Sequence, residues 1–169
     1  MIIRNKIWEN IKEADINYRC AIKYASVQRQ ISFCYKVITP LLAALCAFFT
    51  KLEMPKYSFI SAIIIFISSI LKIFFTQIIL SEKDIDNLDN LGVDFEKYRT
   101  TFEKLLEESD NGSLTDKEVL KTLNKNNIDY CKKKSELNKF VLWIPSCVNK
   151  KLQEESEKYL LRVDHNKYS

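Results

Sequence analysis

Two long apolar stretches interrupt an otherwise densely charged chain. Residues 30–81 contain only five charged side chains. The first stretch, Ile31–Thr50, is free of charge after Lys36, and the second, Tyr57–Ser81, contains a single charge, Lys72. About 20 helical residues rising 1.5 Å each match the roughly 30 Å core of a bilayer. The pattern predicts two transmembrane helices, with spans of about 31–50 and 57–80.

A short polar turn, Lys51–Lys56, separates the two stretches and leaves no room for a domain between them. The spans should therefore form an antiparallel hairpin. Basic residues near span ends favour the cytoplasmic side. Two lie in the turn, whereas four flank the chain-end side, namely Arg19, Lys23, Arg29 and Lys83. We expect a protein of the bacterial inner membrane with both termini in the cytoplasm.

Heptad patterns flank the hairpin on both sides. Apolar residues recur at alternating spacings of three and four, first at Ile7, Ile11, Ala14, Tyr18, Ala21 and Ala25, and again at Leu88, Leu91, Phe95, Tyr98, Phe102 and Leu105. Such seams are typical of packed helices and coiled coils. We expect them to pack antiparallel as a cytoplasmic stalk that extends the hairpin. Pro40 should kink the first span, and Gly92 should mark a bend or a break in the second seam.

The remainder of the chain predicts short helices. Ser109–Ser113 is a clear break, and Thr115 followed by Glu118 is typical of a capped helix start. Helices are expected at about 116–126, 128–144 and 149–162. The apolar patch Phe140–Val148 is too short to span a bilayer, and two interpretations remain open: it lies at the membrane interface with Trp143 as an anchor, or it packs on the stalk.

The predicted fold class is an all-α membrane protein with two regions. Residues 1–109 form the transmembrane hairpin with its helical stalk, and residues 113–169 form a small C-terminal helical region.

Charge and candidate chemistry refine this picture. The net charge is +4, but residues 82–118 carry −7 and residues 119–169 carry +5. The basic charge is mostly Lys, which is more typical of a surface near anionic headgroups than of one that reads nucleic acid. Five scattered Cys suggest neither disulfides nor a zinc site, His165 is the only histidine, and two Gly exclude a phosphate-binding Gly-rich loop. We expect no catalytic residue, no metal and no cofactor, and therefore no enzyme.

The predicted spans contain the candidate pore residues. One stripe of the second span contains the polar side chains Ser61, Ser68, Ser69, Lys72 and Thr76, and the first span has a patch of small residues, Ala43, Ala44 and Ala47. An oligomer could line a water-filled path in this way, although Ser and Thr are also tolerated singly in membrane helices. Lys36 and Lys72 fall at nearly the same depth. They either snorkel to headgroups or form a ring of positive charge at a pore mouth.

The chain resembles the SLATT family of bacterial two-transmembrane effectors associated with nucleotide signalling and anti-phage operons. The resemblance rests on "IWENIKEADINYRCAIKYASVQRQ" (7–30), the hairpin "VITPLLAALCAFFTKLEMPKYSFISAIIIFISSILKIFF" (37–75) and "FEKYRTTFEKLLEES" (95–109). It implies a homo-oligomeric, pore-forming effector, gated by a nucleotide or oligonucleotide signal from a neighbouring gene's nucleotidyltransferase. Basic residues would then meet the signal's phosphates, with candidates Arg19, Lys23, Arg29, Lys132, Lys133 and Lys134. Contact with solvent or lipid headgroups is the alternative for the lysine triplet.

The leading functional hypothesis is an oligomeric membrane pore or ion channel that depolarises the inner membrane in anti-phage defence. A passive membrane anchor or scaffold that recruits a soluble partner is the alternative. A third hypothesis, a soluble protein with a buried hairpin, conflicts with the length of the apolar stretches.

Overall fold

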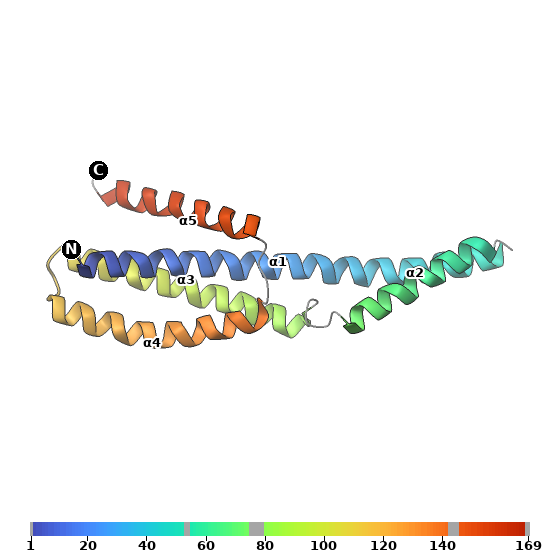
Figure 1. Ribbon diagram of the computed structural model, residues 1–169, viewed down its shortest axis with the longest axis horizontal. Helices are drawn as coiled ribbons and strands as arrows, with labels where there is room; N and C mark the ends of the chain where they lie inside the picture. The colour runs from blue at the N-terminus through green and yellow to red at the C-terminus, as the bar shows by residue number, and fades with distance from the viewer. Residues whose placement is uncertain (1, 53–54, 75–79, 142–145, 168–169) are drawn as a thin grey trace. The chain divides into compact units, whose positions relative to one another are not determined.

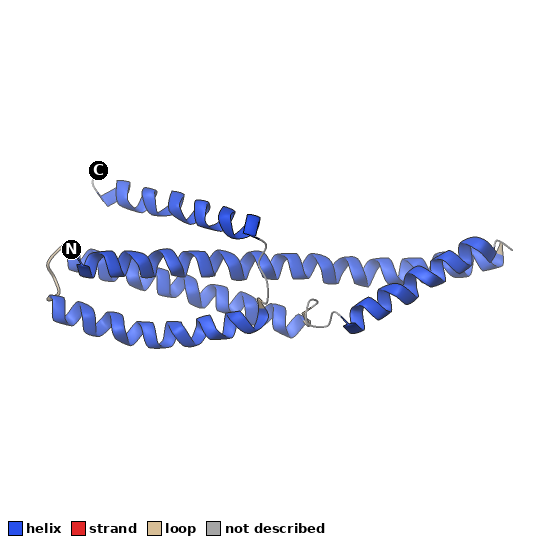
Figure 2. Ribbon diagram, viewed as in Figure 1, coloured by secondary structure: helices blue, strands red, loops and turns tan. Residues whose placement is uncertain are grey.

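The computed structural model describes residues 2–52, 55–74, 80–141 and 146–167. Helices joined by turns and loops make up these ranges, which contain no strand (Figure 2). The helices are α1 (Ile2–Lys51), α2 (Pro55–Phe74), α3 (Glu82–Asp110), α4 (Asp116–Phe140) and α5 (Ser146–Lys167) (Figure 1). The all-helical class expected from the sequence is therefore confirmed.

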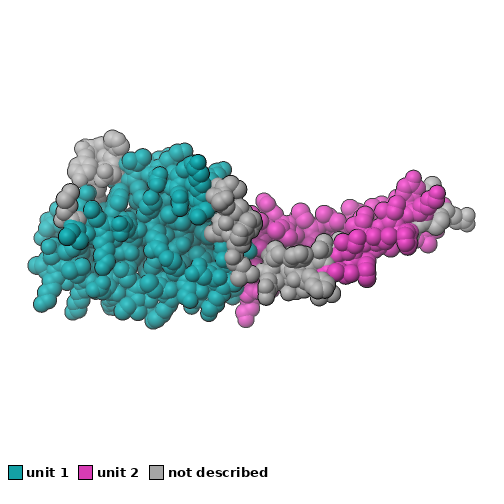
Figure 3. Space-filling view, viewed as in Figure 1, with its two compact units in different colours: residues 1–25, 86–169 teal, residues 26–85 magenta. Residues whose placement is uncertain are grey.

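The chain folds as two compact units that share α1. Unit 1 contains residues 1–25 and 86–169, and unit 2 contains residues 26–85 (Figure 3). The boundary expected from the sequence at Ser109–Ser113 falls inside unit 1, in the loop between α3 and α4.

In unit 1, the first half of α1 packs antiparallel to α3. Three contacts define the register: Arg4 with Asp110, Asp15 with Arg99, and Ile22 with Gly92. The residue numbers increase along α1 while those of their partners decrease along α3, so the two helices are antiparallel. The residues of both predicted seams are buried, apart from Tyr18 and Tyr98, which are half-buried. The expected antiparallel packing of the two seams is correct.

Gly92 does not break α3, so of the two alternatives expected there, a bend or a break, the break is wrong. A Cβ atom at this position would lie only 2.7 Å from Cδ1 of Ile22. The glycine therefore permits a close approach of α1 and α3, and the packing gained offsets its poor helix propensity.

The third helix of unit 1, α4, is longer than expected. Thr115 caps it with a reciprocal pair of hydrogen bonds to Glu118, which confirms the predicted start. It then runs to Phe140 without the predicted break at Asn126–Asn127. Asn costs a helix only a few tenths of a kcal/mol, whereas burial of Val119, Leu123, Tyr130 and Leu137 stabilises the uninterrupted helix.

The last helix, α5, completes unit 1 by burying Leu152, Ser156 and Leu160. Consecutive helices of this unit run in opposite directions, as the N- to C-terminal colour order shows (Figure 1). Unit 1 is thus an up-down-up-down arrangement of the first half of α1 with α3, α4 and α5. Of the predicted apolar patch Phe140–Val148, residues 142–145 lie outside the described residues.

Unit 2 is a helical hairpin in which α2 folds back along the second half of α1 (Figure 1). The rings of Phe49 and Tyr57 lie 5.5 Å apart near the turn, and at the other end the Leu80 N–H donates to Oε1 of Gln28 at 3.2 Å. Helix α1 continues through Pro40 without interruption.

Candidate functional site

The most unusual surface of the molecule is the outside of the unit 2 hairpin. Large apolar side chains face outward from both helices, and Phe33, Phe59 and Phe66 are each about two-thirds exposed, at 67%, 67% and 65%. Helix α1 is long and apolar enough to cross a membrane, and none of its most apolar window is buried. Soluble monomers rarely expose contiguous apolar patches larger than a few hundred Å², and such patches are typical of surfaces that contact lipid or another protein.

The described part of the serine stripe lies within the hairpin and is already hydrogen-bonded. Ser61 is buried and donates to the carbonyl of Tyr57 at 3.0 Å, and Ser69 donates to the carbonyl of Ile65 at 2.8 Å. Bonds of this kind satisfy a hydroxyl without a water-filled path. The side chains of Ser68 and Lys72, and all of Thr76, lie outside the described residues.

The small-residue patch of the first span has a different environment. Ala43, Ala44 and Ala47 are all exposed, so α2 does not cover them. Small side chains on an open helix face allow the backbone of another helix to approach closely. The hairpin therefore retains a face suited to close helix packing.

Lys36 is exposed and forms an ion pair with Glu82. The hydrogen bond from Lys36 and its positive charge lower the pKa of the Glu82 carboxyl. The pair joins the second half of α1 to the start of α3 within unit 2. The carboxylate of Glu82 therefore provides a counter-charge for Lys36.

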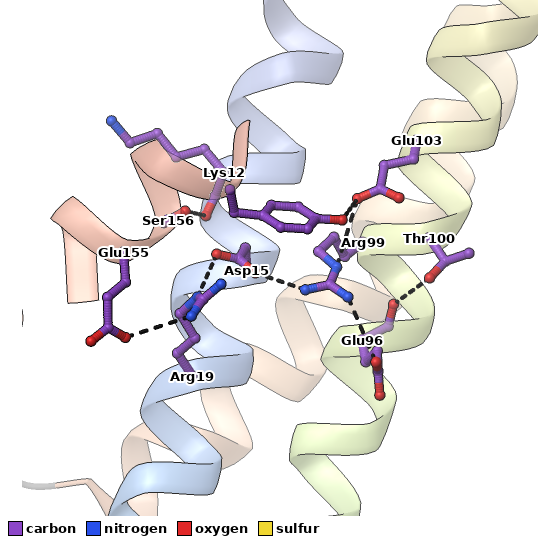
Figure 4. Close-up of polar contacts among 10 residues, drawn as sticks. Lys12, Asp15, Arg19, Glu96, Arg99, Thr100, Glu103, Glu155 and Ser156 are labelled. Carbon is purple, nitrogen blue, oxygen red and sulfur yellow. Dashed lines mark hydrogen bonds and ion pairs between the residues drawn. The ribbon is translucent and has the colours of Figure 1, made fainter. Parts of the chain in front are cut away.

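Unit 1 contains a buried ionic cluster that joins three helices (Figure 4). Asp15 of α1 is fully buried, and its two carboxylate oxygens accept from Arg19 and from Arg99 of α3, each at 2.8 Å. A buried carboxylate is costly unless its lone pairs are satisfied. The two guanidinium groups supply that compensation, and the one from Arg99 fixes α1 against α3.

Arg99 lies between aromatic rings from two helices. Its Cζ atom is 5.3 Å from the centroid of Tyr18 in α1 and 4.6 Å from that of Tyr159 in α5. The Tyr159 hydroxyl donates to Glu103 at 2.6 Å. Burial acts to lower the pKa of Arg99, but the hydrogen bond to Asp15 and neighbouring negative charges raise it above its usual value. The guanidinium therefore remains charged and holds α5 through cation–π contacts.

Further polar contacts attach α5 to α1. Glu155 pairs with Arg19 at 3.5 Å, and the Ser156 hydroxyl donates to the backbone carbonyl of Lys12 at 3.5 Å (Figure 4). Glu157 pairs with Lys12 at 2.9 Å. Together with Tyr159, these residues add polar contacts to the apolar attachment that Leu152 and Leu160 provide.

The basic residues of α1 proposed as ligand contacts are divided between the two units. Arg19 belongs to the Asp15 cluster, and Lys23 is half-buried in the same unit, whereas Arg29 lies on the exposed part of α1 in unit 2.

The predicted lysine triplet on α4 is paired with acidic residues. Lys132 pairs with Asp129 at 3.1 Å and Lys134 with Glu13, while Lys133 bridges Asp94 at 3.2 Å and Glu136 at 3.3 Å.

One pocket on unit 1 was not predicted from the sequence. It has a volume of about 410 Å³ and lies between the start of α3 and the end of α4, lined by Asn87, Asn90, Leu91, Asp94, Lys133, Glu136, Lys139 and Phe140. Its volume is within the range of small-molecule sites. Of its lining residues, only Lys133 was among the predicted ligand contacts. The others could not be predicted as a group, because they come from two helices some forty positions apart in the sequence. Within the described ranges, no group of three His, Cys, Asp or Glu could hold a metal ion.

No family model, curated protein or solved structure matches the chain. The functional argument therefore rests on the apolar hairpin, the ionic cluster and the pocket themselves.

Proposed function

We propose that the chain is a bacterial inner-membrane protein whose unit 2 is a two-span transmembrane hairpin, with unit 1 as its cytoplasmic stalk and both termini in the cytoplasm. The observation that carries the proposal is the outward display of large apolar side chains on both hairpin helices. Lipid satisfies that surface, and each central Ile, Leu or Phe favours insertion by about 0.3–0.6 kcal/mol.

We further propose that the hairpins associate into an oligomeric pore that depolarises the membrane. The exposed face of Ala43, Ala44 and Ala47 supports association, because it allows a helix of a second copy to approach closely. The resemblance to SLATT effectors supports the assignment to anti-phage defence and to gating by a nucleotide-type signal. The unit 1 pocket of about 410 Å³ is the site that we assign to such a signal.

A passive membrane anchor is the second candidate function. The backbone hydrogen bonds of Ser61 and Ser69 favour it, because hydroxyls satisfied within their own helix need no aqueous path. The two functions predict different effects on membrane potential.

The test is induced expression in bacteria with a potential-sensitive dye. A pore collapses the potential, and replacing Ala43 and Ala47 by Leu restores it, because the added bulk blocks close helix approach while keeping the span apolar. The matched control replaces Ile63 and Ile67 of α2 by Leu, which conserves volume and should leave depolarisation unchanged. An unchanged potential with the wild-type chain inserted would refute the pore and support the anchor.

A further inference from the structure

One face of α4 is rich in lysine along the length of the helix. At successive spacings of four, four, three, four, three and four residues it presents the lysine face: Lys117, Lys121, Lys125, Ile128, Lys132, Ser135 and Lys139. All seven side chains are exposed. At 3.6 residues per turn they fall within a sector of about 80°, and they extend over about 33 Å.

The lysine face points away from the core of unit 1. The buried residues of α4, which are Val119, Leu123, Tyr130 and Leu137, lie on the opposite side of the helix. No position of the lysine face is acidic, and the acidic residues of α4 lie beside it. The lysine face therefore presents five lysines and no acidic side chain on an outward-facing side of α4.

Few acidic side chains compensate the positive charge of the lysine face. Among the described residues, Lys117, Lys121, Lys125 and Lys139 form no ion pair, and Lys132 has only the exposed partner Asp129. Like charges four residues apart destabilise a helix, and a lysine in the first turn opposes the helix dipole. Lys117 has both disadvantages, because it lies in the first turn, whereas Lys121 and Lys125 have the first one only. An anionic partner would relieve the repulsion among the three lysines.

The chemistry of the face favours a lipid surface over a nucleic acid. It contains no Arg to pair bidentately with phosphate or base edges and no aromatic ring to stack on bases. At its centre, Ile128 is 62% exposed and is flanked by lysines. Flexible lysines around a single apolar side chain suit the headgroup region of an anionic bilayer. We propose that the lysine face of α4 docks on the anionic phospholipid headgroups of the membrane surface.

This docking goes beyond pore formation and does not require it. If the hairpin spans the membrane as proposed, chain connectivity keeps unit 1 close to a bilayer. Docking would then depend on the lipid composition, on each lysine and on ionic strength. Each lysine near an anionic leaflet should change the docked-to-free ratio about five-fold.

The experiment uses the full-length chain in vesicles of phosphatidylcholine alone or mixed with phosphatidylglycerol. Lysine acetylation is read at each position by mass spectrometry. We expect Lys117, Lys121 and Lys125 to be protected several-fold in the phosphatidylglycerol vesicles, and the protection to disappear at high salt. Exposed Lys97 and Lys104 of α3 should label equally in both.

A matched pair of variants tests the charge directly. The double substitution Lys121→Gln and Lys125→Gln should remove most of the protection at Lys117, whereas Lys97→Gln and Lys104→Gln, with the same change in charge, should leave it intact. Equal labelling of the lysine face in both vesicle types would overturn the proposal. So would protection by added RNA but not by phosphatidylglycerol.

Failure of the membrane hairpin would be recognised separately. Carbonate extraction reports insertion, and it does not depend on the lysines of α4. A chain that stays in buffer without detergent would contradict the hairpin, and its sedimentation with phosphatidylglycerol but not phosphatidylcholine vesicles would still support docking.

Discussion

At the scale of single residues, Asp15 is the side chain on which unit 1 most depends. It is fully buried and accepts from both Arg19 and Arg99. The substitution Asp15→Ala would leave two guanidinium groups without their shared partner. Removing one member of a buried ion pair typically costs about 3–5 kcal/mol. We expect a loss of that size in the free energy of unfolding, measured by denaturant titration of the full-length chain in detergent.

The exposed pair of Lys132 and Asp129 is the control for this prediction. Both side chains are more than 60% exposed, and such pairs contribute about 0–1 kcal/mol. Asp129→Ala should therefore change stability little. Equal effects of the two substitutions would mean that the Asp15 cluster is not a stabilising centre.

Sequence periodicity predicted the buried apolar positions but not this cluster. The seam residues follow a local pattern of threes and fours, so Ile11 and Phe102 could be assigned to the core before the structure was known. Asp15 and Arg99 are 84 positions apart, and nothing local to either residue indicates the other. Their pairing depends on the register of α1 against α3.

At the scale of helices, Tyr159 makes the attachment of α5 sensitive to alkali. Burial, and then the hydrogen bond to Glu103, raise its pKa from 10.0 to about 12. The neutral phenol is thus favoured in the folded state. Its contribution to the free energy of unfolding is complete below pH 10 and is lost as the pH rises from 10 to 12. The substitution Tyr159→Phe should remove this part of the alkaline loss of stability.

A comparison of the wild-type chain with the Tyr159→Phe variant isolates the effect of the Tyr159 hydroxyl. Burial raises the pKa of Cys20 to about 11, so this thiol titrates in the same pH range in both chains. The difference between their curves of unfolding free energy against pH therefore reports Tyr159. Amide hydrogen exchange of α5, measured across this range, locates the loss. Identical curves for the two chains would show that the Tyr159–Glu103 bond does not help to hold α5.

The start of α4 provides a second prediction at this scale. The Thr115 hydroxyl accepts from the backbone N–H of Glu118, so Thr115→Ala should cost about 1 kcal/mol and speed hydrogen exchange in the first turn of α4. The control is Thr101→Ala, where an exposed threonine in the middle of α3 bonds its own helix. That change should be neutral or slightly stabilising.

The existence of the helices was predictable, but their lengths were not always so. The capping box of Thr115 and Glu118 is a local signal and gave the start of α4 correctly. The break predicted at Asn126–Asn127 is wrong, although Asn is a weak helix former and two stand together there. Burial of Leu123 and Tyr130 on either side outweighs them.

At the scale of the whole molecule, the contrast between the two units is largely present in the sequence. The charged flanks form unit 1, and the apolar stretches form unit 2. The inclusion of α4 and α5 in unit 1 could not be predicted, because the ion pairs that join them to α1 link residues more than one hundred positions apart. Such contacts have no periodic signature in the sequence.

The difference between the units yields a prediction about membrane insertion. Ile64 and Phe66 are exposed on α2. Each charged residue placed near the centre of a span costs about 2.5–3.5 kcal/mol. Replacing both by Asp should therefore shift most of the chain from the carbonate-resistant membrane fraction to the soluble or aggregated fraction.

Two equally exposed apolar residues of unit 1, Val93 and Leu161, provide the matched control. Replacing both by Asp adds the same charge, but on a surface that already faces water, so membrane retention should be unchanged. The contrast matters because a general loss of folding would affect both double variants alike. Retention of the Ile64 and Phe66 variant in the membrane would mean that α2 does not face lipid, and that its exposed apolar side chains are instead covered by another protein surface.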